Sequence, residues 1–573
     1  MRIDGADRGL SLGWQRGRFG GAQVSVPNVA DPNRYAGQAG QSNYEGSVAW
    51  YRTSLQASQA GTYVLSFQSA NFRATVWVDG HELGSHSGSY LPFEMRTRLS
   101  AGAHTVVVRT DWRDPGAQSS IGFHRTWFNW GGLDGEVEVR RVGESELSDP
   151  TLQSTLSPDA PDASHASVRV SVLVHNNGPA RTITPEGSLA RAGQSVPIAF
   201  TPVTLEHGRT ATSSAEVSVQ SPSLWSPAAP NLYELSVSVA GESSYTANVG
   251  LRQLSWHGGR LYLNGVQLHL HGATIQEDAH GHGDALTPAD QGAIVAELKA
   301  IGANAARAQH PLDPALLERL DRAGIMVWQG VGPVEGAGNW FSTTPGLTAA
   351  AEQQARTAVL AAELHPSIFA WNLVDEVAGN GRDSQEVEYV STVAHWLHAH
   401  DPTRMVAVDV WGDHPPAHAG AIYANADAVA ETDYSGWYDS PGDTAAQLAA
   451  SMRARLTAME RTFAGKVLVI SEFGAESNNL NPPGAPGSYA FQARLLSEHI
   501  AVYRADPRVT AMLIWVLRDY PLTPTFSGGS IHNALPRVRL IEGLNQKGLF
   551  TYGDQAKTAV GVVARLFHAL PSG

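Results

Sequence analysis

The stretch "NAARAQHPLDPALLERLDRAGIMVWQGV", residues 304–331, decides the fold that this sequence predicts. Two short apolar runs flank a segment whose leucines recur every three or four residues, which indicates a strand, an amphipathic helix and a second strand. Strands that alternate with helical patterns are typical of β-α-β units with a parallel sheet. The stretch therefore predicts one unit of an α/β domain.

The same rhythm continues through the C-terminal part of the chain. After residue 257, amphipathic segments such as "PADQGAIVAELKAIG" separate most of eight short apolar runs. Eight strand-helix units predict a (β/α)8 TIM barrel, which we place at residues 253–573. Loops dominate between the fifth and sixth runs. The runs are "LHLHGATI", "NAARA", "IMVWQGV", "IFAWNLV", "MVAVDV", "AVAETDY", "KVLVISE" and "TAMLIWVL".

The first part of the chain has a different pattern. Residues 1–145 alternate apolar and polar side chains in segments such as "GTYVLSFQSA" and "AHTVVVRTDW", which predicts an all-β sandwich. The Ser-, Pro- and Asp-rich segment "SDPTLQSTLSPDAPDASH" has the composition of a linker. The alternation then returns, so we expect an immunoglobulin-like sandwich over residues 146–252.

Composition excludes several classes of protein. The net charge is −14 and no basic run occurs, so a nucleic-acid backbone would be repelled. The chain contains no cysteine, which excludes disulfides and cysteine-ligated zinc. No apolar stretch reaches the roughly 18 residues of a membrane span. The N-terminus lacks the apolar core of a signal peptide, which fits a cytoplasmic protein or an exported one without its signal. Homo-oligomerisation is left open.

Chemically useful side chains follow the predicted barrel strands. Asp375 and Glu376 follow the fourth apolar run, Tyr434 ends the sixth, Glu472 ends the seventh, and Trp515 belongs to the eighth. Active sites of such barrels lie at the C-terminal ends of the strands. Two carboxylates about 5–5.5 Å apart are what retaining glycoside hydrolysis needs. The alternative is that each acid is a solvated turn residue or a helix cap.

Long motifs in all three parts resemble glycoside hydrolase family 2. "SVAWYRT", "ANFRATVWVDGHELGSHSGSYLPFE" and "FNWGGLDGEVEV" are similar to the family's sugar-binding sandwich. "GGRLYLNGVQLHLHGATIQED" and "GANAARAQHPLDPALLERLDRAGIMV" are similar to its entry into the barrel and to its second and third strands. The resemblance implies a jelly-roll β-sandwich, an immunoglobulin-like β-sandwich and a TIM barrel, with retaining exo-β-glycosidase activity on a carbohydrate or glycoconjugate and no cofactor.

The resemblance also implies roles for single residues. "WNLVDE" matches the family's acid/base segment, so Glu376 would be the acid/base, and "VISEFGAE" makes Glu472 the nucleophile. Tyr434 matches the tyrosine that contacts the nucleophile, and Trp515 matches a tryptophan of the sugar platform. Asp375 replaces the family's asparagine; an ionised aspartate can only accept a hydrogen bond, whereas asparagine can also donate one.

The sugar is predicted from a second motif. "LNQKGLF" carries Asn545 and Lys547, a pair that recognises the substrate carboxylate in β-glucuronidases. The family's Arg-Thr-x-His-Tyr-Pro is one residue shorter here, so Arg307 is matched and either His310 or Gln309 takes the place of the histidine. The acid expected in the sandwich loop is replaced by Arg125 or Thr126. We expect a β-glucuronidase, with a β-galactosidase or another neutral-sugar β-glycosidase as the alternative.

Two further alternatives remain at this stage. The sandwich domains also suit a carbohydrate-binding protein whose barrel has weakened activity, although both Glu376 and Glu472 are present. Four histidines in "HLHGATIQEDAHGHGD" could include metal ligands, because His269 and His271 would share one face of a strand. We expect hydrogen-bonded or loop histidines there rather than a metal site. The other two are His280 and His282.

Overall fold

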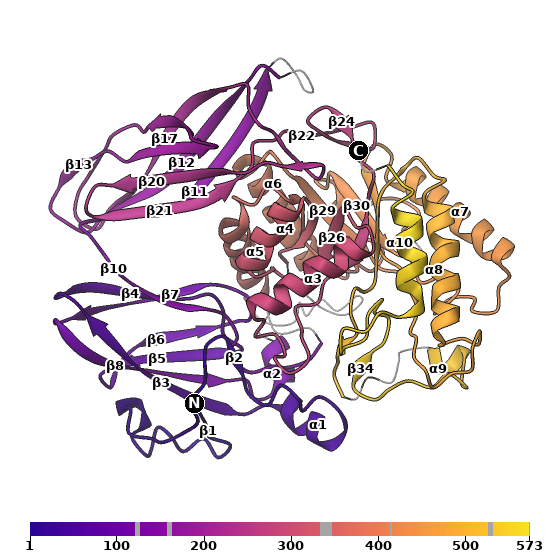
Figure 1. Ribbon diagram of the computed structural model, residues 1–573, viewed down its shortest axis with the longest axis horizontal. Helices are drawn as coiled ribbons and strands as arrows, with labels where there is room; N and C mark the ends of the chain where they lie inside the picture. The colour runs from indigo at the N-terminus through magenta and orange to yellow at the C-terminus, as the bar shows by residue number, and fades with distance from the viewer. Residues whose placement is uncertain are drawn as a thin grey trace.

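A computed structural model describes residues 1–120, 127–157, 163–332, 346–412, 415–524, 526 and 531–571. Two β-sandwiches lie beside a closed barrel whose eight strands are all parallel (Figure 1). Arg125 and Thr126 lie outside the described residues. No helix in the described ranges is long and apolar enough to cross a membrane.

The first sandwich packs a five-stranded sheet against a three-stranded sheet. Its core includes Trp112, Tyr51 and Phe67, which are buried between the sheets. The five-stranded sheet has the order β1 (Arg2–Ile3), β3 (Val48–Ala57), β8 (Gly102–Asp111), β5 (Arg73–Val78), β6 (His81–Ser87). The three-stranded sheet has the order β10 (Val137–Arg141), β4 (Gly61–Phe67), β7 (Phe93–Leu99). Smaller elements are η1 (Trp14–Arg16), β2 (Asn28–Val29), α1 (Gly37–Glu45), α2 (Pro115–Ser120) and β9 (Gly132–Leu133).

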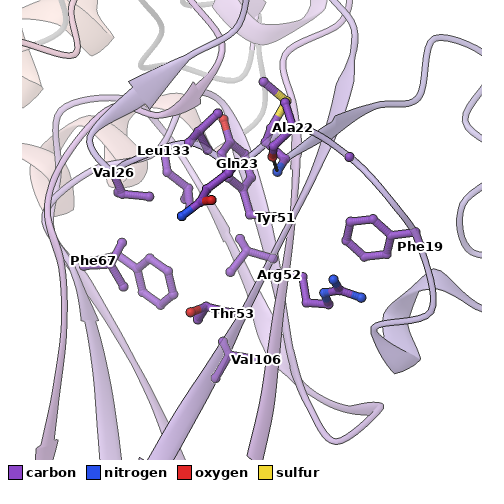
Figure 2. A pocket seen from close by; sticks show the side chains of 15 residues that line it. Phe19, Ala22, Gln23, Val26, Tyr51, Arg52, Thr53, Phe67, Val106 and Leu133 are labelled. Atoms are coloured by element: carbon purple, nitrogen blue, oxygen red, sulfur yellow. Dashed lines mark hydrogen bonds between the residues drawn. The ribbon is translucent and has the colours of Figure 1, made fainter.

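A cavity of about 570 Å³ opens inside this first sandwich (Figure 2). Tyr51, Arg52, Phe67 and Leu133 are among the side chains that surround it. Every lining residue precedes position 138, so the cavity belongs to the sandwich and contains none of the acids predicted for catalysis.

The second sandwich has a core made by strict alternation. In β12 every second residue is buried, including Val168, Val170, Val172 and Val174, as expected for a strand with one face on the core. One sheet has the strand order β11 (Ser145–Ser157), β12 (His165–Asn176), β17 (Thr210–Gln220). The other has the order β15 (Gln194–Ala199), β14 (Glu186–Arg191), β20 (Tyr233–Val239), β21 (Ser243–Val249). Short pairs are β13 (Arg181–Ile183) with β16 (Val203–Leu205) and β18 (Trp225–Ser226) with β19 (Ala229–Pro230).

The predicted linker is wrong over its first ten residues. Positions 148–157 belong to β11, which pairs with β12 along its length apart from an irregularity between Ser148 and Thr151. Leu156 is buried in the sandwich core, so an apolar anchor overrides the loop-like Ser and Pro composition. Residues 158–162 lie outside the described residues.

The barrel closes in chain order and its helices surround it. The strands are β25 (Leu270–Thr274), β26 (Ala305–Ala308), β27 (Met326–Gly330), β28 (Ile368–Asn372), β29 (Met405–Val410), β30 (Ala428–Thr432), β31 (Val467–Glu472) and β32 (Val509–Ile514). The helices are α3 (Pro288–Ala300), α4 (Pro314–Ala323), α5 (Leu347–Ala362), α6 (Ser384–His400), η2 (Ala421–Tyr423), α7 (Ala445–Thr462), α8 (Tyr489–Tyr503), α9 (Ile531–Ala534) and α10 (Thr558–Phe567).

Side-chain caps start five of these helices. Thr287 and Thr444 form capping boxes, and Asp313, Asp383 and Ser488 accept backbone N–H groups at the starts of α4, α6 and α8. The fifth-to-sixth connection contains only η2 in its described part. The remaining strands are β22 (Leu254–His257), β23 (Arg260–Leu263), β24 (Val266–Gln267), β33 (Tyr520–Pro521) and β34 (Leu544–Asn545).

A buried ion pair holds the floor of the barrel. Arg404 donates to the Asp401 carboxylate at 2.8 Å and to the carbonyl oxygens of Glu363, His365 and Ile368 at 2.7, 2.9 and 3.1 Å. The Arg404 side chain is only 5% exposed. One side chain therefore joins the start of β28 to the start of β29.

We expect Arg404→Met to lower the free energy of unfolding by about 3–5 kcal/mol, because Asp401 would be left buried without its cation. Denaturant unfolding followed by circular dichroism measures the change. Arg322→Met is the matched control, since the Arg322–Glu318 pair is exposed and should contribute less than about 1 kcal/mol. Equal shifts in both variants would contradict the importance of the buried pair.

Candidate active site

The barrel strands alternate between an apolar exterior and an interior that becomes polar at the C-terminal ends. In β29, Val406 and Val408 pack outward with the helices, while Met405 and Ala407 fill the barrel floor. The next inward position is Asp409, which is completely buried. The same alternation turns Arg307 of β26 inward between the outward-facing Ala306 and Ala308. A polar layer therefore lies above the apolar floor.

Arg307 is the centre of this polar layer. Its Nη1 donates to Glu472 Oε1 at 2.8 Å, and its Nη2 donates to Asp375 Oδ1 at 2.5 Å and to Asp409 Oδ2 at 2.8 Å. The Arg307 side chain is 0% exposed. A guanidinium group is the only side chain that stays charged and offers several N–H donors in a fixed plane, so it can hold three acids from three strands in one arrangement.

Glu472 lies at the end of β31 and is fixed on both oxygens. Tyr434 donates its hydroxyl to Oε2 at 2.7 Å, while Arg307 binds Oε1. Burial raises the pKa of Glu472, and Arg307 and Tyr434 counteract that effect by stabilising the ionised form. The structure therefore brings together Glu472, Tyr434 and Arg307, three of the residues singled out from the sequence.

Glu376 lies in a different electrostatic environment. It follows β28 with a φ of 48°, in the left-handed region that non-glycine residues rarely adopt. Burial, together with the negative charges of Glu472 and Asp375, raises the pKa of Glu376 well above its ordinary value. Its side-chain hydrogen-bond partner is Thr432 at the end of β30. Glu376 thus favours the protonated form more strongly than Glu472, which has a cation in direct contact.

Gln309 and His310 have different surroundings. Gln309 Nε2 donates to Asp375 Oδ2 at 2.7 Å, and its Oε1 accepts from Trp127 Nε1 at 3.1 Å. His310 instead hydrogen-bonds Glu277 Oε2 at 3.0 Å and stacks on Tyr90 of the first sandwich. The sequence left both residues open for the family's histidine; Gln309 is the one that contacts the catalytic layer, and a substrate role for His310 stays a prediction.

An aromatic wall includes Trp515 and a residue of the first sandwich. The Trp515 ring lies 5.7 Å from the Arg307 guanidinium carbon, and the Trp127 ring meets it edge-on at a centroid distance of 6.2 Å. Trp127 also contacts Tyr520 at 6.1 Å. Sequence reasoning missed Trp127, although it stands beside the aromatic-rich "FNWGG" segment that carried the family resemblance.

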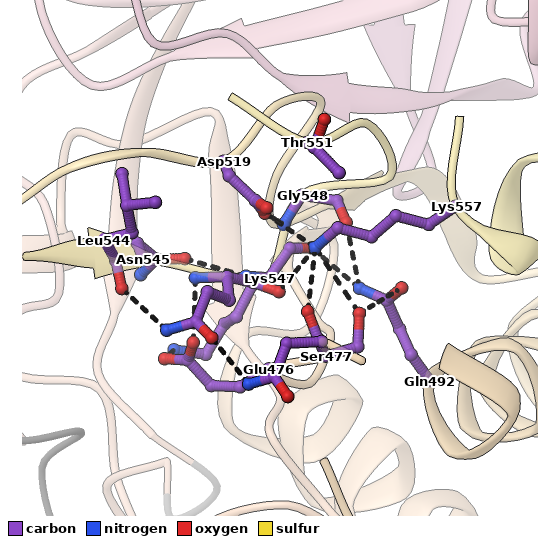
Figure 3. A network of polar contacts seen from close by, with 12 residues as sticks. Glu476, Ser477, Gln492, Asp519, Leu544, Asn545, Lys547, Gly548, Thr551 and Lys557 are labelled. Carbon is purple, nitrogen blue, oxygen red and sulfur yellow. Dashed lines mark hydrogen bonds and ion pairs between the residues drawn. The ribbon is translucent and has the colours of Figure 1, made fainter. Parts of the chain in front are cut away.

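Asn545 and Lys547 are held by a buried network (Figure 3). Lys547 Nζ donates to Glu476 Oε1 at 3.0 Å and to the Tyr438 hydroxyl at 2.8 Å, and it lies 5.6 Å from the centre of the Tyr434 ring. Burial opposes the charged form, yet Glu476 and Tyr438 raise the pKa of Lys547. Asn545 Oδ1 accepts the backbone N–H of Lys547 at 3.0 Å, which shapes this turn.

A second buried lysine, Lys557, binds the backbone of the turn that carries Asn545 and Lys547. Lys557 Nζ donates to Asp519 Oδ1 at 2.7 Å and to the carbonyl oxygens of Gln546 and Ser477 at 2.9 and 3.1 Å (Figure 3). Gln492 adds donors to the carbonyl oxygens of Lys547 and Gly548 at 3.0 and 3.1 Å, which leaves the turn that carries Lys547 little freedom.

The four histidines are dispersed among other partners. His271 hydrogen-bonds the Gly302 carbonyl, His280 packs edge-on against Tyr552, and His282 pairs with Asp290. His269 presents its backbone carbonyl to Asn304. In the part of the chain that the structure describes, no group of three or more His, Asp or Glu side chains could hold a metal ion.

Comparison with known proteins agrees with this geometry. The family model for the TIM barrel domain of glycosyl hydrolases family 2 matches residues 255–520, and a second model described as glycosyl hydrolases family 2 matches residues 146–252. The chain belongs to glycoside hydrolase family 2. A model of the β-galactosidase second all-β domain matches residues 20–115.

Relatives of this family 2 glycosidase carry several activities in their names. A β-glucuronidase of Paenibacillus borealis is 25% identical, covering 94% of this chain and 90% of that protein. A β-galactosidase of Arthrobacter sp. is 26% identical, but the match covers 84% of this chain and 43% of that longer protein. A family 2 β-galacturonidase from Eisenbergiella tayi, bound to galacturonate, has the same fold with a TM-score of 0.82, 22% identity and coverage of 96% and 94%.

The hydroxyl of Tyr434 yields a pH-dependent prediction. Tyr434→Phe removes a donor that stabilises ionised Glu472, so the pKa of Glu472 rises and the acidic limb of kcat/KM moves to higher pH. We expect kcat/KM at low pH to fall about 10- to 100-fold, as for a lost hydrogen bond to a charged group. Tyr438→Phe is the control, because Tyr438 contacts Lys547 instead. An acidic limb that moves equally in both variants would refute the assignment.

Proposed function

We propose that the protein is a retaining exo-β-glucuronidase. The observation that carries this proposal is the position of the Lys547 ammonium group against the ring of Tyr434, whose hydroxyl binds Glu472. A cation at the rim of the catalytic layer suits a sugar that carries a carboxylate. The names of the curated relatives from Paenibacillus borealis and Bacteroides fragilis, both β-glucuronidases, support the same substrate class.

The reaction proceeds through two displacements. A Glu472 carboxylate oxygen attacks the anomeric carbon, the glycosidic C–O bond breaks, and Glu376 gives its proton to the leaving oxygen. Glu376, now ionised, takes a proton from water, which attacks the same carbon and releases Glu472 as a carboxylate. Two inversions at one carbon retain the anomeric configuration.

The contacts around the two glutamates suit these opposite roles. Glu472 is paired with Arg307 and with Tyr434, which favour the ionised nucleophile. Glu376 lies beside two like charges, and this favours the proton that the leaving group needs. Trp515 stands beside Arg307 and would supply an apolar face for the sugar ring.

Lys547 retains capacity for a substrate carboxylate. An ammonium group has three N–H donors, and Tyr438 and Glu476 accept two of them. The third can donate to a carboxylate of the sugar, with the Asn545 amide nitrogen as a second donor. Lys557 and Gln492 donate hydrogen bonds to the backbone carbonyl oxygens of Gln546 and Lys547, so the turn is already held in place before substrate binds.

One contact favours the alternative, a β-galactosidase or another neutral-sugar β-glycosidase. The Glu476 carboxylate already compensates the charge of Lys547, and a second carboxylate from the substrate would lie close to Glu476. A neutral sugar meets no such repulsion. A side-by-side screen of aryl β-glucuronide, β-galacturonide, β-galactoside, β-glucoside and β-mannoside decides between them; higher kcat/KM on a neutral sugar than on either uronide would reject the uronidase.

The two glutamates should respond differently to substitution. We expect Glu472→Gln to lower kcat by at least about 10⁴-fold on every aryl glycoside, because an amide cannot form the glycosyl ester. Glu376→Gln should cost about 10²–10⁴-fold with a poor leaving group and far less with an activated aryl group that needs no proton. Stopped assays with the two leaving groups measure this, and near-wild-type turnover by Glu472→Gln would exclude the mechanism.

Lys547 should discriminate between charged and neutral sugars. Lys547→Met alone would bury an uncompensated Glu476, so the informative variant is Lys547→Met combined with Glu476→Gln. We expect its kcat/KM on the uronide to fall about 10- to 100-fold, and its kcat/KM on neutral aryl glycosides to change much less. Glu476→Gln alone is the matched control. Equal losses on charged and neutral sugars would remove Lys547 from carboxylate recognition.

A further inference from the structure

Asp409 is a buried acid that the mechanism above does not use. It belongs to β29, its side chain is 0% exposed, and its Oδ2 accepts from Arg307 Nη2 at 2.8 Å. The same Nη2 donates to Asp375 Oδ1 at 2.5 Å. Two carboxyl groups from neighbouring strands therefore converge on one nitrogen atom, while the other oxygen of Asp409, Oδ1, is buried without a hydrogen-bond partner among the described residues. A buried carboxylate oxygen that accepts no hydrogen bond disfavours the ionised form, whereas a protonated carboxyl group can itself donate.

The charges around the pair make full ionisation costly. Arg307 is the cation in contact with Asp375, Asp409 and Glu472, and Glu376 adds a fourth acid beside them. Two uncharged side chains also face the pair: Gln309 donates to Asp375, and Ser471 of β31 lies beside Asp409. The next cation in this layer, Arg455 of α7, is engaged by Asp433 and lies 3.8 Å from Glu431 of β30. Buried charges without partners are strongly disfavoured.

We propose that Asp375 and Asp409 hold one proton between them, and that Asp409 is the positioning residue that keeps Asp375 fixed beside Glu472. This proton lets the pair donate a hydrogen bond, as the N–H of an asparagine amide would. Glu472 accepts from Arg307 on one oxygen and from Tyr434 on the other, so it is the acid that stays ionised. With Glu376 also protonated, the layer then carries one excess negative charge, which suits the positive charge that develops on the sugar. This inference rests on glycoside hydrolysis at this site and not on the identity of the sugar.

Electrostatics supports the shared proton. Burial raises the pKa of Asp409 to about 7, the negative charge of Asp375 adds to this, and Arg307 opposes it. Burial likewise raises the pKa of Asp375. Unfolded aspartate titrates near its ordinary value of about 3.9. Between these values the native state binds more protons than the unfolded state, so this pair stabilises the fold at low pH and the stabilisation is lost as pH rises towards 7.

The test compares Asp409→Asn with Asp409→Leu. The asparagine amide can donate to Asp375 at every pH and keeps the single negative charge that the pair has with one proton, whereas leucine cannot donate. We expect Asp409→Leu to lower kcat/KM about 10- to 100-fold and Asp409→Asn to restore most of that loss. If asparagine is as damaging as leucine, Asp409 is needed as an anion and the shared proton is refuted; if leucine has no effect, Asp409 does not position Asp375.

Thermal unfolding between pH 5 and pH 8 tests the proton without any assay of activity. The melting temperature of Asp409→Asn minus that of wild type should increase with pH, because only wild type loses the pair's proton. Asp433→Asn is the matched control: although burial opposes it, Arg455 lowers the pKa of Asp433, so that group stays ionised throughout. A flat difference for Asp409→Asn would overturn the proposal. If wild type cleaved no aryl glycoside, the proposed function would fail, and this measurement would still decide the proton.

Discussion

The ion pairs of Arg307 are the constraint on which the site depends. One guanidinium group contacts acids that come from the ends of β28, β29 and β31, so it fixes the relative positions of three strands as well as three side chains. Breaking such a network leaves buried charges without partners, which costs far more than an exposed ion pair. The arrangement pre-orients Glu472 before substrate binds, and pre-orientation of charged groups is a major source of catalytic power.

Segments outside the eight barrel strands also contribute side chains to the site. The first sandwich contributes Trp127, which donates to Gln309 and packs against Trp515. The segment after the last barrel strand contributes Lys547. The buried ion pairs Lys547–Glu476 and Lys557–Asp519 hold that segment. Trp127 and Lys547 therefore both contribute to the site at the barrel mouth, although 420 positions separate them in the sequence.

The electrostatic balance explains why a pair of acids can replace an amide beside the acid/base. Asp375 receives N–H donors from Arg307 and Gln309, and Asp409 accepts from the same nitrogen of Arg307. Asp409 faces it from the next strand, where the resemblance to the family gave no role to any residue. Strand alternation in "MVAVDV" accounts only for its inward orientation, on the same face as Met405 and Ala407, whereas its contact with Arg307 is tertiary.

The sequence by itself determined the family, the barrel, the sandwiches and the strand ends that carry Glu376, Glu472, Tyr434 and Trp515, because these depend on local periodicity and on long motifs. It misjudged residues 148–157, where burial of Leu156 outweighs a loop-like composition. Only the tertiary structure decided that Gln309 and not His310 touches the catalytic layer, that Glu476 compensates Lys547, and that Trp127 and Asp409 join the site. These contacts link residues far apart in the chain, and their existence depends on distances and burial that no local pattern encodes.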